Sequence, residues 1–280
     1  MLSFNFLCLN CLARSRNILL TPSGSCSILI FVPPPYYTNE VNFIKGGGGG
    51  GRIKPYITLF YPAHHITTGE GGAILTNDRK LAQIVRSFRD WGRDCYCDGG
   101  KNNSCGHRFA GQYGTLPPGY DHKYVYSEIG YNLKITDMQA AIGCAQMDKL
   151  ERFCERRKEN FRSYTDIFRK YEKYLILPEA TDKADPSWFA YIISVKKDAP
   201  FSRDEFIQYL NSKLIETRNL FAGNIIRQPF FEGVKYRAVG DLVNSDFIMT
   251  NTFFLGTYPG ITSEMMDYIK STVDSFMGKF

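Results

Sequence analysis

The sequence from position 60 to 73 reads Phe60-Tyr61-Pro62-Ala63-His64-His65-Ile66-Thr67-Thr68-Gly69-Glu70-Gly71-Gly72-Ala73. An apolar, β-prone run from Tyr56 to Tyr61 precedes the two histidines, and a second such run, Ala73 to Thr76, follows the glycines. The pattern therefore predicts a strand, a polar loop that carries paired imidazoles, and a second strand.

The two imidazoles are the groups of this loop that can take part in proton transfer. A histidine side chain has an ordinary pKa of ~6.5, so His64 or His65 can act as a general acid or base near neutrality. The glycines at 69, 71 and 72 permit backbone angles and close approaches that a Cβ atom forbids. The alternative from these residues alone is a β-hairpin whose histidines are merely solvated.

The same stretch resembles the cofactor-lysine loop of sugar aminotransferases that use pyridoxal phosphate, the DegT/DnrJ/EryC1/StrS family, with its pattern F-x-x-T-K-N-x-T-T-G-E-G-G. His64 stands at the position of the family's Schiff-base lysine, and His65 where the family commonly has asparagine. An imidazole cannot form that Schiff base. The resemblance therefore implies non-covalent pyridoxamine phosphate and the chemistry of the deoxysugar 3-dehydrases, which remove a hydroxyl from a nucleotide 4-keto-6-deoxyhexose.

The resemblance also implies an α/β fold, the fold type I of pyridoxal phosphate-dependent aminotransferases, with an incomplete large domain and a smaller α+β C-terminal domain. It begins near Phe60 and runs to the C-terminus. We expect residues 1–55, with six consecutive glycines at 46–51, to be an unassigned, disordered or aberrant segment. Residues 56–150 are predicted to be a remnant of the cofactor-binding domain, and 151–280 a connecting helix plus the small domain; the family's N-terminal part is expected to be missing or altered.

Composition limits the function classes. The chain has 280 residues, 44% of them hydrophobic and 22% charged, as in ordinary globular proteins. The net charge is +6, with lysines and arginines spread along the chain rather than concentrated, which argues against a nucleic-acid partner. No apolar run approaches the ~20 residues that a membrane-spanning helix needs, so we expect a cytoplasmic protein without a membrane partner.

Periodicity and capping residues predict further elements. Asn77 is expected to cap a helix over 78–91, followed by a long irregular stretch over 93–130. A capping box of Thr136 and Gln139 predicts a long helix over 137–171, with Met138 and Ile142 among its buried positions. A strand is predicted over 188–196, and helices over 202–214, 240–249 and 262–277.

Three cysteines lie in the irregular stretch with the spacing C-x-C-x₇-C: Cys95, Cys97 and Cys105. Clustered thiolates suit zinc or an iron–sulfur cluster, although incidental thiols are an equal alternative from composition alone. The spacing also resembles the iron–sulfur 3-dehydrases, whose pattern adds a fourth cysteine upstream, where this chain has Tyr37. The resemblance implies a 2Fe-2S cluster with its fourth cysteine ligand absent from the expected position; Cys8, Cys11 and Cys26 are poor replacements.

The resemblance assigns roles to particular residues. His64 is the catalytic base, and His65 lies beside it in a cofactor-binding or structural role. The element from Gly130 to Asp137 resembles the family's G-Y-N-x-R-x-T-D, which implies that Asn132 and Lys134 reach the cofactor phosphate of the neighbouring subunit in a homodimer. Candidate contacts to the sugar or diphosphate of the substrate are Arg218, Asn224 and Gln228.

The implied partners are a CDP-linked 4-keto-6-deoxyhexose and an NADH-dependent flavin and iron–sulfur reductase that supplies electrons, in dideoxysugar and O-antigen biosynthesis. Leu59 replaces a serine that in the family helps to hold the phosphate. The rival readings are an ordinary sugar aminotransferase, a cluster-free dehydrase, and a metal-binding or interface module without catalysis. An inactive fragment of a dehydrase is a further alternative.

Overall fold

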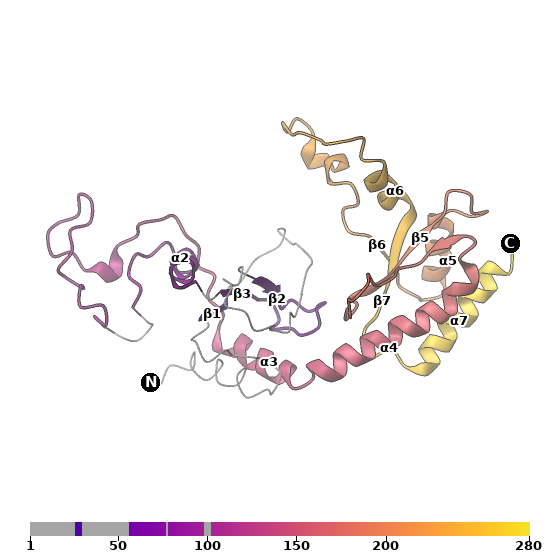
Figure 1. The fold of residues 1–280 in the computed structure, drawn as a ribbon, viewed down its shortest axis with the longest axis horizontal. Helices are drawn as coiled ribbons and strands as arrows, with labels where there is room; N and C mark the ends of the chain where they lie inside the picture. The colour runs from indigo at the N-terminus through magenta and orange to yellow at the C-terminus, as the bar shows by residue number, and fades with distance from the viewer. Residues whose placement is uncertain (1–25, 30–55, 77, 98–101) are drawn as a thin grey trace. The chain divides into compact units, whose positions relative to one another are not determined.

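The computed structural model describes residues 26–29, 56–76, 78–97 and 102–280, which form two compact units over 1–150 and 151–280 (Figure 1). Most of the segment predicted to be unassigned, together with Cys8, Cys11, Tyr37 and Asn77, lies outside the described residues. The assignment of 56–150 as a remnant of a cofactor-binding domain stays a prediction.

Unit 1 is built on a three-stranded antiparallel sheet in the order β1-β3-β2. Its strands are β1 (Cys26–Leu29), β2 (Tyr56–Leu59) and the central β3 (Gly72–Thr76). The pairing of Leu59 with Gly72 brings both ends of the histidine loop together. The predicted strand, loop and strand are confirmed.

Helix α2 (Arg79–Arg89) follows β3 directly. Its N-cap is Asp78, whose carboxylate accepts hydrogen bonds from the backbone N–H groups of Lys80 and Leu81 at 2.9 and 3.2 Å. Ala82 is buried against Ile74, Val85 and Leu133. Ile84 and Phe88 of the same helix remain 52% and 38% exposed.

The single helix predicted over 137–171 is wrong, since two helices occupy this range: α3 (Asp137–Met147) and α4 (Leu150–Phe168). The break falls at Asp148 and Lys149, where the N–H of Lys149 bonds to the carbonyl of Gln146, three residues back rather than four. The predicted capping box of Thr136 and Gln139 is confirmed. The predicted burial along α3 is wrong: Met138 is 77% exposed, and the helix meets the 60–73 loop through a bond from Gln139 to the Glu70 carbonyl.

Unit 2 is an antiparallel sheet of four strands in the order β4-β5-β7-β6. The strands are β4 (Leu175–Ile176), β5 (Ala190–Val195), β6 (Arg218–Asn219) and β7 (Thr252–Gly256). Strand β5 confirms the run predicted at 188–196, shortened at both ends.

The core of unit 2 lies where one face of this sheet meets α4, α5 (Arg203–Ser212) and α7 (Ser263–Met277). Aromatic rings dominate it: Phe206 stacks on Phe276 with ring centroids 4.7 Å apart and meets Phe253 edge-on at 5.6 Å. The largest completely buried side chains are Tyr164, Phe168, Leu175, Tyr191, Ile193, Val195, Phe206, Leu210, Phe253, Leu255 and Val273.

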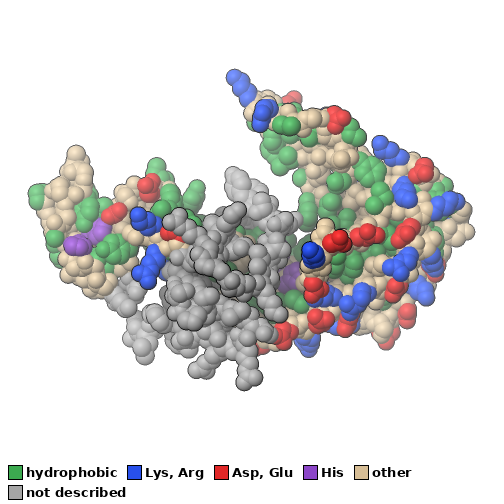
Figure 2. All heavy atoms as spheres, in the orientation of Figure 1, with side chains coloured by type: hydrophobic (Ala, Val, Ile, Leu, Met, Phe, Trp, Pro, Cys, Tyr) green, Lys and Arg blue, Asp and Glu red, His purple; other side chains and the backbone are tan. Residues whose placement is uncertain are grey.

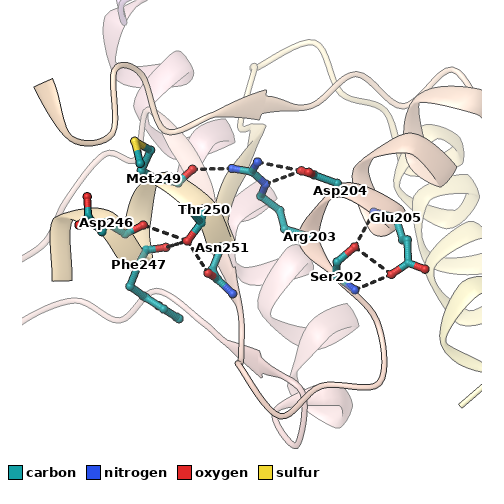
Figure 3. Close-up of polar contacts among 9 residues, drawn as sticks. All are labelled: Ser202, Arg203, Asp204, Glu205, Asp246, Phe247, Met249, Thr250 and Asn251. Atoms are coloured by element: carbon teal, nitrogen blue, oxygen red, sulfur yellow. Dashed lines mark hydrogen bonds and ion pairs between the residues drawn. The ribbon is translucent and has the colours of Figure 1, made fainter. Parts of the chain in front are cut away.

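Capping residues fix the helix starts of unit 2. Ser202 and Glu205 form the predicted capping box at α5 (Figure 3). Thr262 caps α7. Arg203 donates to the Met249 carbonyl at 2.7 Å and so joins α5 to α6 (Val243–Asn251). Helix α6 begins later than the predicted Gly240, because Leu242 adopts a left-handed conformation with φ of 56°.

Polar side chains also join α4 to the strand ends. Arg157, 5% exposed, donates to the carbonyls of Trp188 and Phe189 at 3.4 and 3.2 Å, while Asn160 donates to the Tyr258 carbonyl at 2.8 Å and Tyr164 to the Gly256 carbonyl at 3.1 Å. Burial lowers the pKa of Arg157 from its ordinary value. These bonds fix the segment after β7 against α4.

Acidic and basic side chains alternate over the visible face of unit 2 (Figure 2). Among the described residues, no helix combines the length and the apolar composition needed to cross a bilayer.

Replacing Phe206 with alanine should lower the free energy of unfolding of unit 2 by about 3–5 kcal/mol, because the ring is completely buried among aromatic neighbours. Phe230→Ala is the matched control: its ring is 64% exposed, so the loss should stay within about 0.5 kcal/mol. Urea denaturation of the full chain measures both, and equal losses would contradict the position of the core.

Candidate functional site

The loop from Phe60 to Gly71 is closed by hydrogen bonds that converge on one residue. The N–H of Phe60 donates to the Gly71 carbonyl at 2.8 Å, and its own carbonyl accepts from the Thr68 N–H at 2.8 Å and the Thr67 hydroxyl at 2.9 Å. Gly69 has a φ of +86°, a conformation that glycine adopts without strain. The loop is thus a tight, internally bonded turn.

His64 lies at the start of this turn. Its N–H donates to the Tyr61 carbonyl at 3.0 Å, and its half-buried ring meets the Tyr61 ring edge-on, with centroids 4.4 Å apart. His65 is half-buried beside it. The hydroxyls of Thr67 and Thr68 are both used to hold the turn, the second through the Glu70 carbonyl at 2.7 Å. The imidazoles are therefore the groups of this loop that can carry a proton near neutral pH.

Asn132 and Lys134 lie together at the end of α2, and both are exposed. Backbone bonds from Trp91 to Tyr131 at 2.7 Å and from Leu133 to Arg89 at 3.0 Å hold this segment. The Lys134 ammonium sits 3.4 Å from the centroid of the Trp91 ring and 3.9 Å from the Asp90 carboxylate. Burial lowers the pKa of Lys134, against the attraction of Asp90.

Gly92 lies where the end of α2 meets the segment that carries Asn132, and this position requires a glycine. Its φ is +82°, and a Cβ atom would collide with the carbonyl oxygen of Glu128. The N–H of Gly92 donates to the Ser87 carbonyl at 2.8 Å, while its own carbonyl accepts from Ser127 at 3.1 Å. A side chain at this position would separate the end of α2 from the segment that carries Asn132.

The structure brings the three predicted cysteines into one group of interacting thiols. Cys95 and Cys105 both lie close enough to the Cys97 thiol to influence its pKa. A hydrogen bond from Ser104 is the main cause that lowers the pKa of Cys97 to about 7, while burial raises that of Cys95. All three cysteines are partly buried. In the part of the chain that the structure describes, however, no set of three or more histidine, cysteine or acidic side chains is arranged as a preformed metal site.

Sequence reasoning missed the residues that hold the cysteine loop. Arg108 forms a two-pronged ion pair with Asp121, with N–O distances between 2.7 and 3.1 Å, and Asp94 pairs with His122 at 2.5 Å. Nothing local in the sequence connects Asp94 with a residue 28 positions later. The only local sign that this segment carries interacting charged groups is the adjacent pair Asp121 and His122.

The three candidate substrate residues of unit 2 lie on or beside the segment after β6. Arg218 is exposed and paired with Glu216, whereas Asn224 is 3% exposed and donates to Asp246 at 2.7 Å. Gln228 donates to the Ala222 carbonyl at 3.1 Å. The amide groups of Asn224 and Gln228 therefore hold the segment itself. Substrate contact by all three residues stays a prediction.

Comparisons with known proteins give the class of the fold. A solved structure titled E coli GDP-4-keto-6-deoxy-D-mannose-3-dehydratase with bound hydrated PLP matches with a TM-score of 0.65 at 25% identity, covering 83% of this chain and 57% of that one. The fold is that of the fold type I, pyridoxal phosphate-dependent aminotransferase-like enzymes, as predicted.

Residues 47–274 match the DegT/DnrJ/EryC1/StrS aminotransferase family, and the chain belongs to this family. It is 55% identical over 219 residues to the lipopolysaccharide biosynthesis protein RfbH of Salmonella typhimurium, covering 78% of this chain and 50% of the relative. It is 49% identical over 220 residues to the dTDP-4-dehydro-2,6-dideoxy-D-glucose 3-dehydratase of Saccharopolyspora spinosa, covering 79% and 47%. The chain thus spans about half the length of these relatives.

Replacing Asp246 with alanine should loosen the segment that carries Asn224 and Arg227, since its carboxylate accepts from both side chains. Hydrogen exchange at the amides of Arg227 and Gln228 should become faster. The Arg227 guanidinium and then Asn224 hold the pKa of Asp246 below its ordinary value, so this support is present at neutral pH and is lost as the pH falls through the lowered pKa.

Glu216→Ala is the control for this loop, because it removes an acidic side chain whose partner, Arg218, is exposed. Its exchange rates should match those of the unaltered chain. Unchanged exchange in the Asp246 variant would show that the carboxylate does not hold the segment.

Proposed function

We propose that this chain supplies the catalytic base of a 3-dehydrase that removes the C3 hydroxyl from a nucleotide-linked 4-keto-6-deoxyhexose, with pyridoxamine phosphate as cofactor. The observation that carries the proposal is the imidazole of His64 on the β2–β3 turn, in a chain of the DegT/DnrJ/EryC1/StrS family. Two relatives support the reaction class: one is named a 3-dehydratase, and one a lipopolysaccharide biosynthesis protein.

The donor set of the turn fits a cofactor held without a covalent bond. Residues 60–73 contain no lysine, and the threonine hydroxyls are occupied within the turn, which leaves the imidazoles as its reactive groups. Asn132 and Lys134 are exposed donors suited to a phosphate, and Lys134 carries the positive charge that a phosphate requires. The Lys134 ammonium is held between the Trp91 ring and the Asp90 carboxylate.

Bound pyridoxamine phosphate would supply an amine for the C4 ketone of the sugar and a pyridinium ring that takes up electron density when the C4′ carbon loses a proton and returns it as the C3 hydroxyl departs. An imidazole nitrogen of His64 takes the proton from the C4′ carbon of the cofactor, and that proton leaves with the hydroxyl as water. The edge-on ring of Tyr61 limits the orientations that the imidazole can adopt. His65, its neighbour in the turn, is proposed to have a cofactor-binding or structural role.

We further propose that Cys95, Cys97 and Cys105 hold a 2Fe-2S cluster that carries single electrons from an NADH-dependent reductase. The electrostatic influence of Cys95 and Cys105 on the Cys97 thiol supports a common site. Soft thiolate ligands on an irregular loop suit iron–sulfur chemistry. The nucleotide is proposed to be CDP and the setting dideoxysugar biosynthesis in the cytoplasm.

Replacing His64 with asparagine should lower the rate of C3 dehydration about 10²–10⁴-fold, because the variant lacks the proton acceptor. The measurement is release of ¹⁸O-labelled water from sugar labelled at the C3 hydroxyl, with pyridoxamine phosphate present and no reductase needed. CDP, dTDP and GDP forms of the sugar are compared. His65→Asn should change the rate less than about ten-fold, and an active His64 variant would overturn the proposed base.

The exposed Asn132 and Lys134 support a homodimer in which each subunit completes the cofactor site of the other. Chains with His64→Asn and chains with Asn132→Ala should each be impaired alone. After mixing and reassociation, roughly a quarter of the unaltered activity should return, since about half the dimers are mixed and each holds one intact site. No recovery on mixing would show that each site is built within one subunit.

A further inference from the structure

Trp91 has a strained backbone at the corner where α2 ends. Its φ is +65°, in the left-handed region, which costs free energy for a bulky residue and persists only where the surrounding contacts fix it. Its N–H donates to the Tyr131 carbonyl at 2.7 Å, and Gly92 follows with a φ of +82°. The indole is 42% exposed, so this strained position presents an aromatic ring at the surface of unit 1.

Two positive side chains from distant parts of the sequence meet on the Trp91 ring. The Lys134 ammonium lies 3.4 Å from the ring centroid, and the guanidinium carbon of Arg93 lies 5.6 Å from the same centroid. Arg93 also lies 5.9 Å from the ring centroid of Tyr126. Burial first, and then the positive charges of Arg89 and Arg93, lower the pKa of Lys134. The Trp91 ring therefore holds two cations close enough to repel each other.

The nearby carboxylates do not balance these positive charges. Asp90 accepts from the Arg89 guanidinium at 2.8 and 2.9 Å and lies 3.9 Å from Lys134. Asp94, the residue after Arg93, pairs with a histidine instead. Among the described residues, the buried Nε–H of Arg93 has no hydrogen-bond acceptor. A buried donor without an acceptor costs free energy, and together with the excess of positive charge it favours the binding of an anion.

We propose that Arg93 binds a phosphate group together with Lys134, and that the Trp91 ring holds the two cations in place for this contact. A guanidinium offers two parallel donors that match the oxygens of a phosphate, whereas a lysine ammonium offers a point charge. The phosphate is a monoester or part of a diphosphate. This inference rests on the proposed contact between Lys134 and a phosphate, and it adds Arg93 as a binding residue and Trp91 as a positioning residue.

The direct test is isothermal titration calorimetry of the full chain with pyridoxamine phosphate and with CDP, using pyridoxamine and cytidine as the matched ligands without phosphate. Arg93→Ala should weaken phosphate binding about 10–100-fold, because a charge-assisted contact is lost. A loss for pyridoxamine phosphate identifies the cofactor as the source of the phosphate, and a loss for CDP identifies the nucleotide. Unchanged affinity for both, or no binding of either by the unaltered chain, overturns the proposal.

Further variants separate phosphate binding from a purely structural role, with the thermal unfolding midpoint of each recorded beside its affinity. Arg93→Lys keeps the charge without the paired donors, so its affinity should lie between those of Arg93→Ala and the unaltered chain. Trp91→Gly removes the ring and relieves the left-handed strain, and it should still weaken phosphate binding about ten-fold. Unchanged phosphate affinity in Trp91→Gly overturns the positioning role of the ring.

Arg152→Ala is the matched control for Arg93→Ala. The Arg152 guanidinium also lies 5.6 Å from an aromatic centroid, that of Phe153, but in the described part of the chain no second cation lies on that ring. Its removal should leave the affinity for both phosphate compounds unchanged. An equal loss in the two arginine variants would show a general effect of net charge and would overturn the site.

Calorimetry needs no turnover, so failure of this proposal is distinguishable from failure of the proposed reaction. If phosphate binding depends on Arg93 but the unaltered chain releases no ¹⁸O, the reaction fails and the phosphate site stands. If ¹⁸O is released and Arg93→Ala binds both phosphate compounds as the unaltered chain does, the phosphate site fails and the reaction stands.

Discussion

The candidate site depends on the hydrogen bonds made by the backbone of Phe60. Its N–H and its carbonyl between them bond to Gly71, Thr68 and Thr67, so one residue closes both sides of the turn. The turn places the two histidines immediately beyond the end of β2, with Tyr61 against His64. Because the hydroxyls of both threonines form hydrogen bonds within the turn, its imidazoles are the groups left for proton transfer.

The remaining candidate residues are held in place by two different kinds of interaction. Asn132 and Lys134 depend on backbone bonds to the end of α2 and on the left-handed Gly92, where a larger residue would collide. The cysteine loop instead depends on side-chain ion pairs, Arg108 with Asp121 and Asp94 with His122. The first arrangement therefore depends on backbone geometry, and the second on charged side chains.

The elements with strong local signals could be predicted from the sequence. The capping boxes at Thr136 and Ser202 gave correct helix starts, and the apolar run of β5 gave a correct strand. The break between α3 and α4 could not be predicted, because Asp148 and Lys149 are ordinary residues for the middle of a helix. The pairing of Asp94 with His122 likewise depends on a fold that brings distant residues together. The site roles of His64, Asn132 and Lys134 remain predictions.

Arg157 makes the unfolding of unit 2 more cooperative. Its guanidinium lies in the interior among the carbonyls of Trp188 and Phe189 and the Thr257 hydroxyl, without an acidic partner among the described residues. Pulling away either strand end would leave a buried charge without its compensating dipoles, at a cost of several kcal/mol. Fraying at this end of the sheet is therefore suppressed until α4 itself detaches, so we expect the helix and both central strands to open as a single unit.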